Sequence, residues 1–105
     1  MKVLLDACVP RPLRKFLPDH AVRTAQEMGW AQLKNGALLR EAEGQFEAFI
    51  STDQNLKYQQ TVVGRKIAIL VLPTNDWPAI RARTDEIAAK VAALKPGDFV
   101  ELQWN

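Results

Sequence analysis

Short apolar runs alternate along this chain with stretches in which apolar residues recur at helical spacing. The runs at 2–5, 48–52 and 67–72 predict buried strands, because parallel strands that are covered on both faces are apolar throughout. Residues 20–24 and 99–104 alternate between apolar and polar positions. This alternation predicts two further strands, the last of them at an edge of the sheet.

Helical patterns fill the segments between these runs. Pro10 and Pro12 suit the first turn of a helix that ends at Pro18, and Asn35 is a favourable N-cap for the next helix. One long helix is expected over residues 76–94, where apolar residues recur on one face. Alternating strands and helices predict an α/β fold, a three-layer α/β/α sandwich with a mainly parallel central sheet.

Composition limits what surrounds this sheet. With 105 residues, of which 48% are hydrophobic, the chain has material for one core, so we expect a single domain over residues 1–105. No apolar run approaches the roughly 20 residues that span a bilayer, and the first residues are too soon acidic for a signal peptide. The lone Cys8 fits a reducing compartment. We therefore expect a soluble, cytoplasmic protein with no membrane partner.

Two aspartates follow predicted strands directly. Asp6 ends the first apolar run and Asp53 ends the run at 48–52. If the second strand lies outside the first and the third lies on its other side, both carboxylates face the crevice at the switch point. Carboxylates there can hold Mg²⁺ or Mn²⁺ for phosphodiester hydrolysis, although an Asp after a strand is also a common helix cap.

Basic residues follow both aspartates, although the net charge is only +2. A charge this small does not by itself hold a polyanion strongly, so the positions of the cations matter more than their total. They either steer a phosphodiester toward the carboxylates or form solvated helix faces. The cations in question are Arg11, Arg14 and Lys15 after Asp6, and Lys57, Arg65 and Lys66 after Asp53.

Several motifs agree in order and spacing with a known family. They are Val3-Leu4-Leu5-Asp6-Ala7-Cys8-Val9-Pro10, Glu27-Met28-Gly29-Trp30 with Leu33-Lys34-Asn35-Gly36, and Ser51-Thr52-Asp53-Gln54-Asn55-Leu56 followed by Tyr58-Gln59-Gln60. In these motifs the chain resembles the DUF5615 PIN-like family of small bacterial proteins, over about residues 1–72. That family is related to PIN-domain nucleases and to the Mut7-C group. Asp6 and Asp53 match its acids at the ends of the first and third strands.

The resemblance implies a function as well as a fold. Members of this family are viewed as toxins of type II toxin–antitoxin pairs, encoded beside a small DUF433-type antitoxin. The implied activity is that of a ribonuclease dependent on Mg²⁺ or Mn²⁺, acting on single-stranded RNA. Asp6 and Asp53 would then be both the catalytic residues and the metal ligands. The implied partners are the RNA and the cognate antitoxin, and a homodimer is a further partner that the chain itself would supply.

The chain also departs from that pattern. Related sequences commonly carry an acid directly after the first aspartate, where this chain has Ala7, and another where it has Asn35, Gly36 and Ala37. Asn35 can offer a carbonyl oxygen, which is a weaker, uncharged metal ligand. These departures support an alternative function, a catalytically impaired interaction module that binds an antitoxin or dimerises. Apolar surface around Trp30 or Trp77 would serve that alternative.

The remaining candidates each have a functional and a structural interpretation. Glu27 or Glu41 would be a third acid, or a solvated side chain. Cys8 would be a nucleophile or a packing thiol, and His20 a catalyst or a hydrogen-bonding residue. Trp30, Trp77 and Trp104 would stack on bases or pack in the core. The predicted substrate-binding residues are Arg11, Arg14, Asn55, Lys57 and Tyr58.

Overall fold

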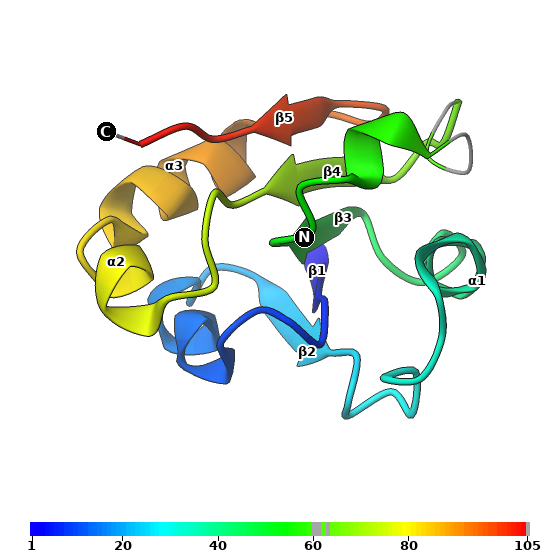
Figure 1. Ribbon diagram of the computed structural model, residues 1–105, viewed down its shortest axis with the longest axis horizontal. Helices are drawn as coiled ribbons and strands as arrows, with labels where there is room; N and C mark the ends of the chain where they lie inside the picture. Colours follow the sequence, from blue (N-terminus) through cyan, green and yellow to red (C-terminus); the bar gives the residue numbers. More distant parts are fainter. Residues whose placement is uncertain (60–61, 63, 105) are drawn as a thin grey trace.

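Five parallel strands form the centre of the fold in the computed structural model, which describes residues 1–59, 62 and 64–104. Their order across the sheet is β2-β1-β3-β4-β5. The strands are β1 (Lys2–Leu5), β2 (Ala21–Thr24), β3 (Ala48–Ser51), β4 (Ala68–Val71) and β5 (Phe99–Glu101). Figure 1 shows them stacked from β5 to β2, with β2 at one edge and β5 at the other. The predicted α/β class and the parallel sheet are confirmed.

The strand order reverses between β1 and β3, which is the arrangement in which Asp6 and Asp53 are expected to face one crevice. The chain leaves β1 toward β2 on one side and then crosses to β3 on the other. Leu5 pairs with Ile50, and the Asp6 amide continues the ladder by donating to the Ile50 carbonyl oxygen at 2.9 Å. This register brings the first residues beyond β1 beside the end of β3 at the switch point.

Helices cover both faces of the sheet (Figure 1). The 3₁₀ helix η1 (Arg11–Phe16), α2 (Trp77–Arg81) and α3 (Thr84–Ala93) pack on one face, where their apolar residues join the side chains of Val3 and Leu5. On the other face, α1 (Asn35–Ala42) and the 3₁₀ turn η2 (Leu56–Tyr58) join Leu4 and Phe49. Successive strand residues point to opposite faces, so the inner strands β1, β3 and β4 contribute to both cores.

Two expectations about helices are wrong in detail. The long helix expected over 76–94 is two helices, because the chain turns at Ala82 and Arg83 and α3 starts afresh at Thr84. The Arg83 amide donates to the Ile80 carbonyl oxygen at 2.9 Å, three residues back, which is the tightened last turn of α2. The N-cap of α1 is Lys34, and Asn35 is the first helical residue. The Asn35 side chain therefore does not cap this helix.

No helix within residues 1–59, 62 and 64–104 is long and apolar enough to cross a membrane.

Candidate functional site

Asp6 lies at the C-terminal end of β1, half-buried, with both carboxylate oxygens engaged by neighbouring donors. Oδ1 accepts the Ala7 amide at 2.8 Å, and Oδ2 accepts the Ser51 hydroxyl at 2.8 Å. The Asp6 carbonyl oxygen also accepts the Val9 amide at 3.0 Å, which folds the loop back toward η1. The carboxylate is thus held at the edge of the sheet by β3 and by its own loop.

Asp53 is held in the same way at the end of β3. Its Oδ1 accepts the Asn55 amide at 2.9 Å, and its Oδ2 accepts the Asn35 side-chain Nδ2 at 2.7 Å. Asn35 stands on the first turn of α1, so this bond joins the helix to the sheet edge. With the nitrogen directed at Asp53, Asn35 supports that carboxylate as a donor.

Ser51, which the sequence pattern does not single out, joins the two aspartates. Its hydroxyl donates to Asp6, while its Oγ accepts the Asp53 amide at 3.0 Å. The Cys8 Sγ lies 3.7 Å from the same oxygen. Because the single hydroxyl proton is committed to Asp6, the Cys8 thiol is the donor in that last contact. A hydroxyl residue at the buried end of an otherwise apolar strand was the available signal, since a fully buried hydroxyl requires partners.

The donor set fits a hard divalent cation. Within the described part of the chain, each of the four carboxylate oxygens of Asp6 and Asp53 accepts one hydrogen bond. A carboxylate oxygen has two lone pairs, so each keeps one for a further ligand. Mg²⁺ commonly binds to one or two carboxylates and keeps several waters. Among the described residues there is no group of three or more His, Cys, Asp or Glu side chains arranged for a metal. Any metal here would rest on two acids.

Glu27, one of the two candidates for a third acid, is committed to structure. Its amide donates to the Thr24 hydroxyl at 3.1 Å, and its Oε1 accepts the Thr24 amide at 2.9 Å. This reciprocal pair is a capping box, and Thr24-Ala25-Gln26-Glu27 shows its sequence signature. The Thr24 amide, more than the neighbouring Arg14, lowers the pKa of the Glu27 carboxyl below its ordinary value. Glu41, the other candidate, is exposed on α1.

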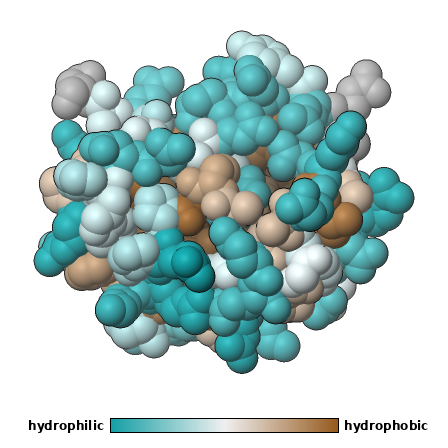
Figure 2. All heavy atoms as spheres, turned by 60° about the horizontal axis from the view of Figure 1, so that its bottom comes forward, coloured by the Kyte–Doolittle hydropathy of each residue, from teal (hydrophilic) through white to brown (hydrophobic). Residues whose placement is uncertain are grey.

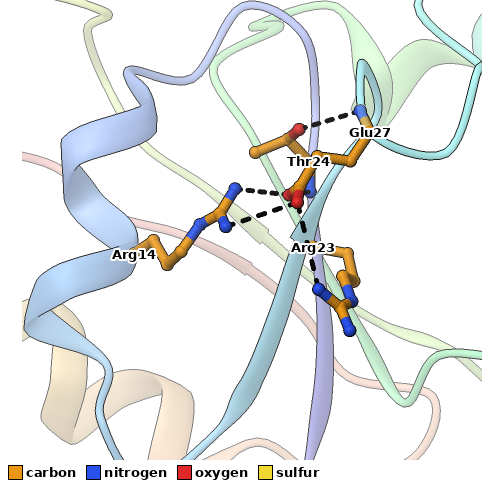
Figure 3. A network of polar contacts seen from close by, with 4 residues as sticks. All are labelled: Arg14, Arg23, Thr24 and Glu27. Carbon is orange, nitrogen blue, oxygen red and sulfur yellow. Dashed lines mark hydrogen bonds and ion pairs between the residues drawn. The ribbon is translucent and has the colours of Figure 1, made fainter.

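Arg14 reaches from η1 to Glu27 (Figure 3), so it is placed at the C-terminal end of β2 beside the carboxylate site. Both of its terminal nitrogens donate to the two Glu27 oxygens, and Arg23 approaches the same carboxylate from β2 at 3.9 Å. Arg11, by contrast, is exposed on η1 with no ion pair among the described residues. The two arginines predicted to bind substrate therefore differ in how firmly they are held.

The predicted substrate residues after Asp53 lie on and before η2. The Asn55 amide supports Asp53 directly, and its side chain is exposed. Lys57 pairs with Glu101 of β5 at 3.6 Å, and its Nζ lies 5.3 Å from the centre of the Tyr58 ring. Tyr58 is 75% exposed, so its ring is available to a partner. The ion pair with Glu101 places the Lys57 side chain toward β5.

The other singled-out residues have packing partners. His20 Nδ1 lies 3.3 Å from the Met1 amino nitrogen. The Trp30 and Phe46 rings meet edge-on with their centres 6.1 Å apart, and the centres of the Trp77 and Phe16 rings are 6.0 Å apart. The Trp104 indole donates to Glu86 at 2.8 Å. All three tryptophans are half-buried, in agreement with their structural interpretation.

Comparison of the chain with protein-family models, curated proteins and solved structures finds no match.

Proposed function

We propose that this chain is a metal-dependent hydrolase of phosphodiester bonds, with single-stranded RNA as its substrate. The observation that supports this most is the pair of aspartates at the switch point, joined through Ser51 and each with acceptor capacity to spare. Mg²⁺ or Mn²⁺ bound there supplies a Lewis acid that polarises a phosphate oxygen and acidifies water.

The chain's own residues would have separate tasks. Asp6 and Asp53 provide the charged ligands, and Ser51 fixes the orientation of one carboxylate relative to the other. Asn35 holds Asp53 from α1 through a charge-assisted hydrogen bond. The reaction consumes one water molecule and divides the strand into one fragment with a terminal phosphate and one with a terminal hydroxyl.

The resemblance to the DUF5615 family adds a cellular role to the proposal. In that role the chain is the cytoplasmic toxin of a bacterial toxin–antitoxin pair, neutralised by a small DUF433-type protein. The alternative is an interaction module without catalysis, and one observation favours it. Within the described residues only two acids gather at the site, and Asn35 stands beside Asp53 where a third acid would add charge.

A cleavage assay separates the two functions. Purified protein is incubated with labelled single-stranded RNA and Mn²⁺, with and without chelator, as wild type, Asp6→Asn and Asp53→Asn. The nuclease proposal expects cleavage that chelator abolishes and that each variant lowers by at least about 100-fold, because each loses a charged ligand. Asp19→Asn is the matched control, since Asp19 is exposed in the loop between η1 and β2.

Growth arrest on expression gives a second readout. The nuclease proposal expects the arrest to disappear in the same two variants and to persist in Asp19→Asn. Wild-type protein without metal-dependent cleavage, together with partner binding unchanged by Asp6→Asn, would establish the interaction module instead.

A further inference from the structure

A group of cations lies on the helices that flank the carboxylate site. Arg11, Arg14 and Lys15 line a shallow hollow of about 460 Å³ on η1. Arg81 of α2 adjoins them, because its guanidinium lies 4.3 Å from the centre of the Phe16 ring at the end of η1. We call Arg11, Arg14, Lys15 and Arg81 the cationic strip.

The strip begins at the same edge of the sheet as the two aspartates. η1 starts shortly after Asp6, and α2 follows the end of β4 by way of Pro73 and Asp76. Both segments therefore leave the C-terminal ends of strands and pack on the same face of the sheet. Figure 1 shows η1 and α2 side by side, and the contact between Phe16 and Trp77 joins them. A chain of phosphates that reaches Asp6 can thus continue over the strip.

Three members of the strip keep their charge available. Arg11, Lys15 and Arg81 are exposed and have no carboxylate partner among the described residues, whereas Arg14 is paired with Glu27. The Arg81 guanidinium lies over the Phe16 ring, a contact that does not use its N–H donors. Guanidinium groups held in this way are suited to phosphate oxygens. The face brought forward in Figure 2 is hydrophilic over most of its area, with apolar atoms across its middle.

We propose that the cationic strip binds consecutive phosphates of a single-stranded nucleic acid and guides its backbone to Asp6 and Asp53. This inference rests on the proposed function for the direction of the strand, although the binding itself needs no catalysis. A single strand is preferred because its backbone can bend from the strip toward the half-buried carboxylates, which the regular backbone of a duplex cannot follow. RNA and DNA share the phosphate chemistry that the strip recognises.

The test is equilibrium binding of a fluorescein-labelled uridine oligonucleotide of about 12 nucleotides, a length within the range of single-strand sites. Chelator is present throughout, so that cleavage cannot consume the probe. The variants are Arg11→Gln/Lys15→Gln and Arg81→Gln. Lys66→Gln/Lys95→Gln is the control, because it removes the same charge from a hollow at the opposite, N-terminal edge of the sheet. Arg14 is left intact, since its loss would also release Glu27.

Each cation that contacts a phosphate of a single strand contributes about 0.7 to the slope of log affinity against log salt, so at 0.1 M salt its loss costs about fivefold. We expect about 25-fold weaker binding for the double strip variant and about fivefold for Arg81→Gln. The control should lose much less. Equal losses in strip and control variants, or no binding by the wild type, would overturn the proposal.

Further probes test the kind of strand. A thymidine oligonucleotide should bind within a few-fold of the uridine one, and an RNA duplex more weakly. Tighter binding of the duplex would refute the single-strand assignment, and loss of binding to DNA would refute recognition through phosphates.

The failure of this inference and that of the proposed function are distinguishable. Binding that depends on the strip without any cleavage by the wild type would remove the nuclease function and retain the strip. Cleavage by the wild type, with binding unaffected in the strip variants, would remove the strip and retain the nuclease function.

Discussion

The Ser51 hydroxyl donates to Oδ2 of Asp6 at 2.8 Å, across the gap between β3 and β1. Ser51 is fully buried, and its oxygen also accepts the Asp53 amide. One small side chain therefore couples the ends of two strands that are far apart in sequence, and it does so at the place where both candidate ligands emerge.

Ser51→Ala should lower the free energy of unfolding by about 1–3 kcal/mol, because a buried amide and a carboxylate each lose a partner. A cycle with Asp6→Asn tests whether the effect runs through Asp6. The two residues are in contact, so the coupling measured by urea unfolding should exceed about 0.5 kcal/mol. Additive losses would show that the Ser51–Asp6 bond contributes nothing to stability.

Asn35→Asp should change how the protein responds to metal. Without metal the variant should be less stable than wild type by about 1 kcal/mol, since it loses the donor to Asp53 and adds a like charge. Mn²⁺ should reverse the loss and raise the melting temperature more than it does for wild type, because a third carboxylate strengthens the site. Asn35→Ala is the control, as it removes the hydrogen bond and adds no ligand. A similar Mn²⁺ effect in both variants would argue against a metal site beside Asp53.

Glu43 should give the protein a pH-dependent part of its stability. The Lys66 amide first, and the Arg65 guanidinium next, lower the pKa of its carboxyl below the ordinary value near 4.5. A lowered folded-state pKa means that the stabilisation is complete above the unfolded-state pKa and disappears as the pH falls through the folded-state value. The melting temperature of Glu43→Gln should therefore fall below that of wild type at pH 7 and approach it in acid.

Glu41→Gln is the matched control for that measurement, because Glu41 lies in the last turn of α1, two residues before Glu43 at its C-cap, and is exposed without a described partner. Its difference from wild type should be small at every pH. A difference for Glu43→Gln that persists unchanged into acid would mean that the side chain acts through packing and not through its charge.

Phe49→Ala should be the most damaging of these changes to stability. Phe49 is fully buried in β3, where it packs against the α1 face of the sheet, and a truncation of this kind costs about 3–5 kcal/mol. Phe99→Ala makes the same chemical change in β5, where the ring is 36% exposed, and should cost about 1 kcal/mol or less. Denaturant unfolding of the two variants measures the difference. Equal costs would contradict the position of β3 at the centre of the sheet.

The strands that meet at the switch point could be predicted from the sequence, because buried parallel strands are uninterrupted apolar runs. Their order across the sheet could not, because an apolar run does not specify which strands are its neighbours. The position of Asp6 and Asp53 at the edge of the sheet followed from the ends of those runs. The division of the helix over 76–94 could not be predicted in the same way. Ile80 and Ile87 are seven residues apart, and this spacing suits one continuous helix as well as two that meet at Arg83.

The hydrogen bonds of the site could not be predicted from the periodicity of the sequence either. Asn35 looks like a cap in the sequence, because asparagine favours that position. A shift of one residue at the start of α1 instead turned its side chain toward Asp53, and only the tertiary arrangement determines that choice. The role of Ser51 could not be predicted for a related reason, since its partners lie at the end of another strand and in the next loop.

The Glu27 carboxylate has a consequence for the edge of the sheet. β2 is an outer strand, and its alternate amides point away from β1, among them that of Thr24. Glu27 occupies this Thr24 amide, and Arg14 and Arg23 surround the same carboxylate with charge. A strand from another molecule that attempted to add here would have to displace a bound carboxylate and meet two guanidinium groups. The same capping box therefore disfavours self-association of the protein through the edge of β2.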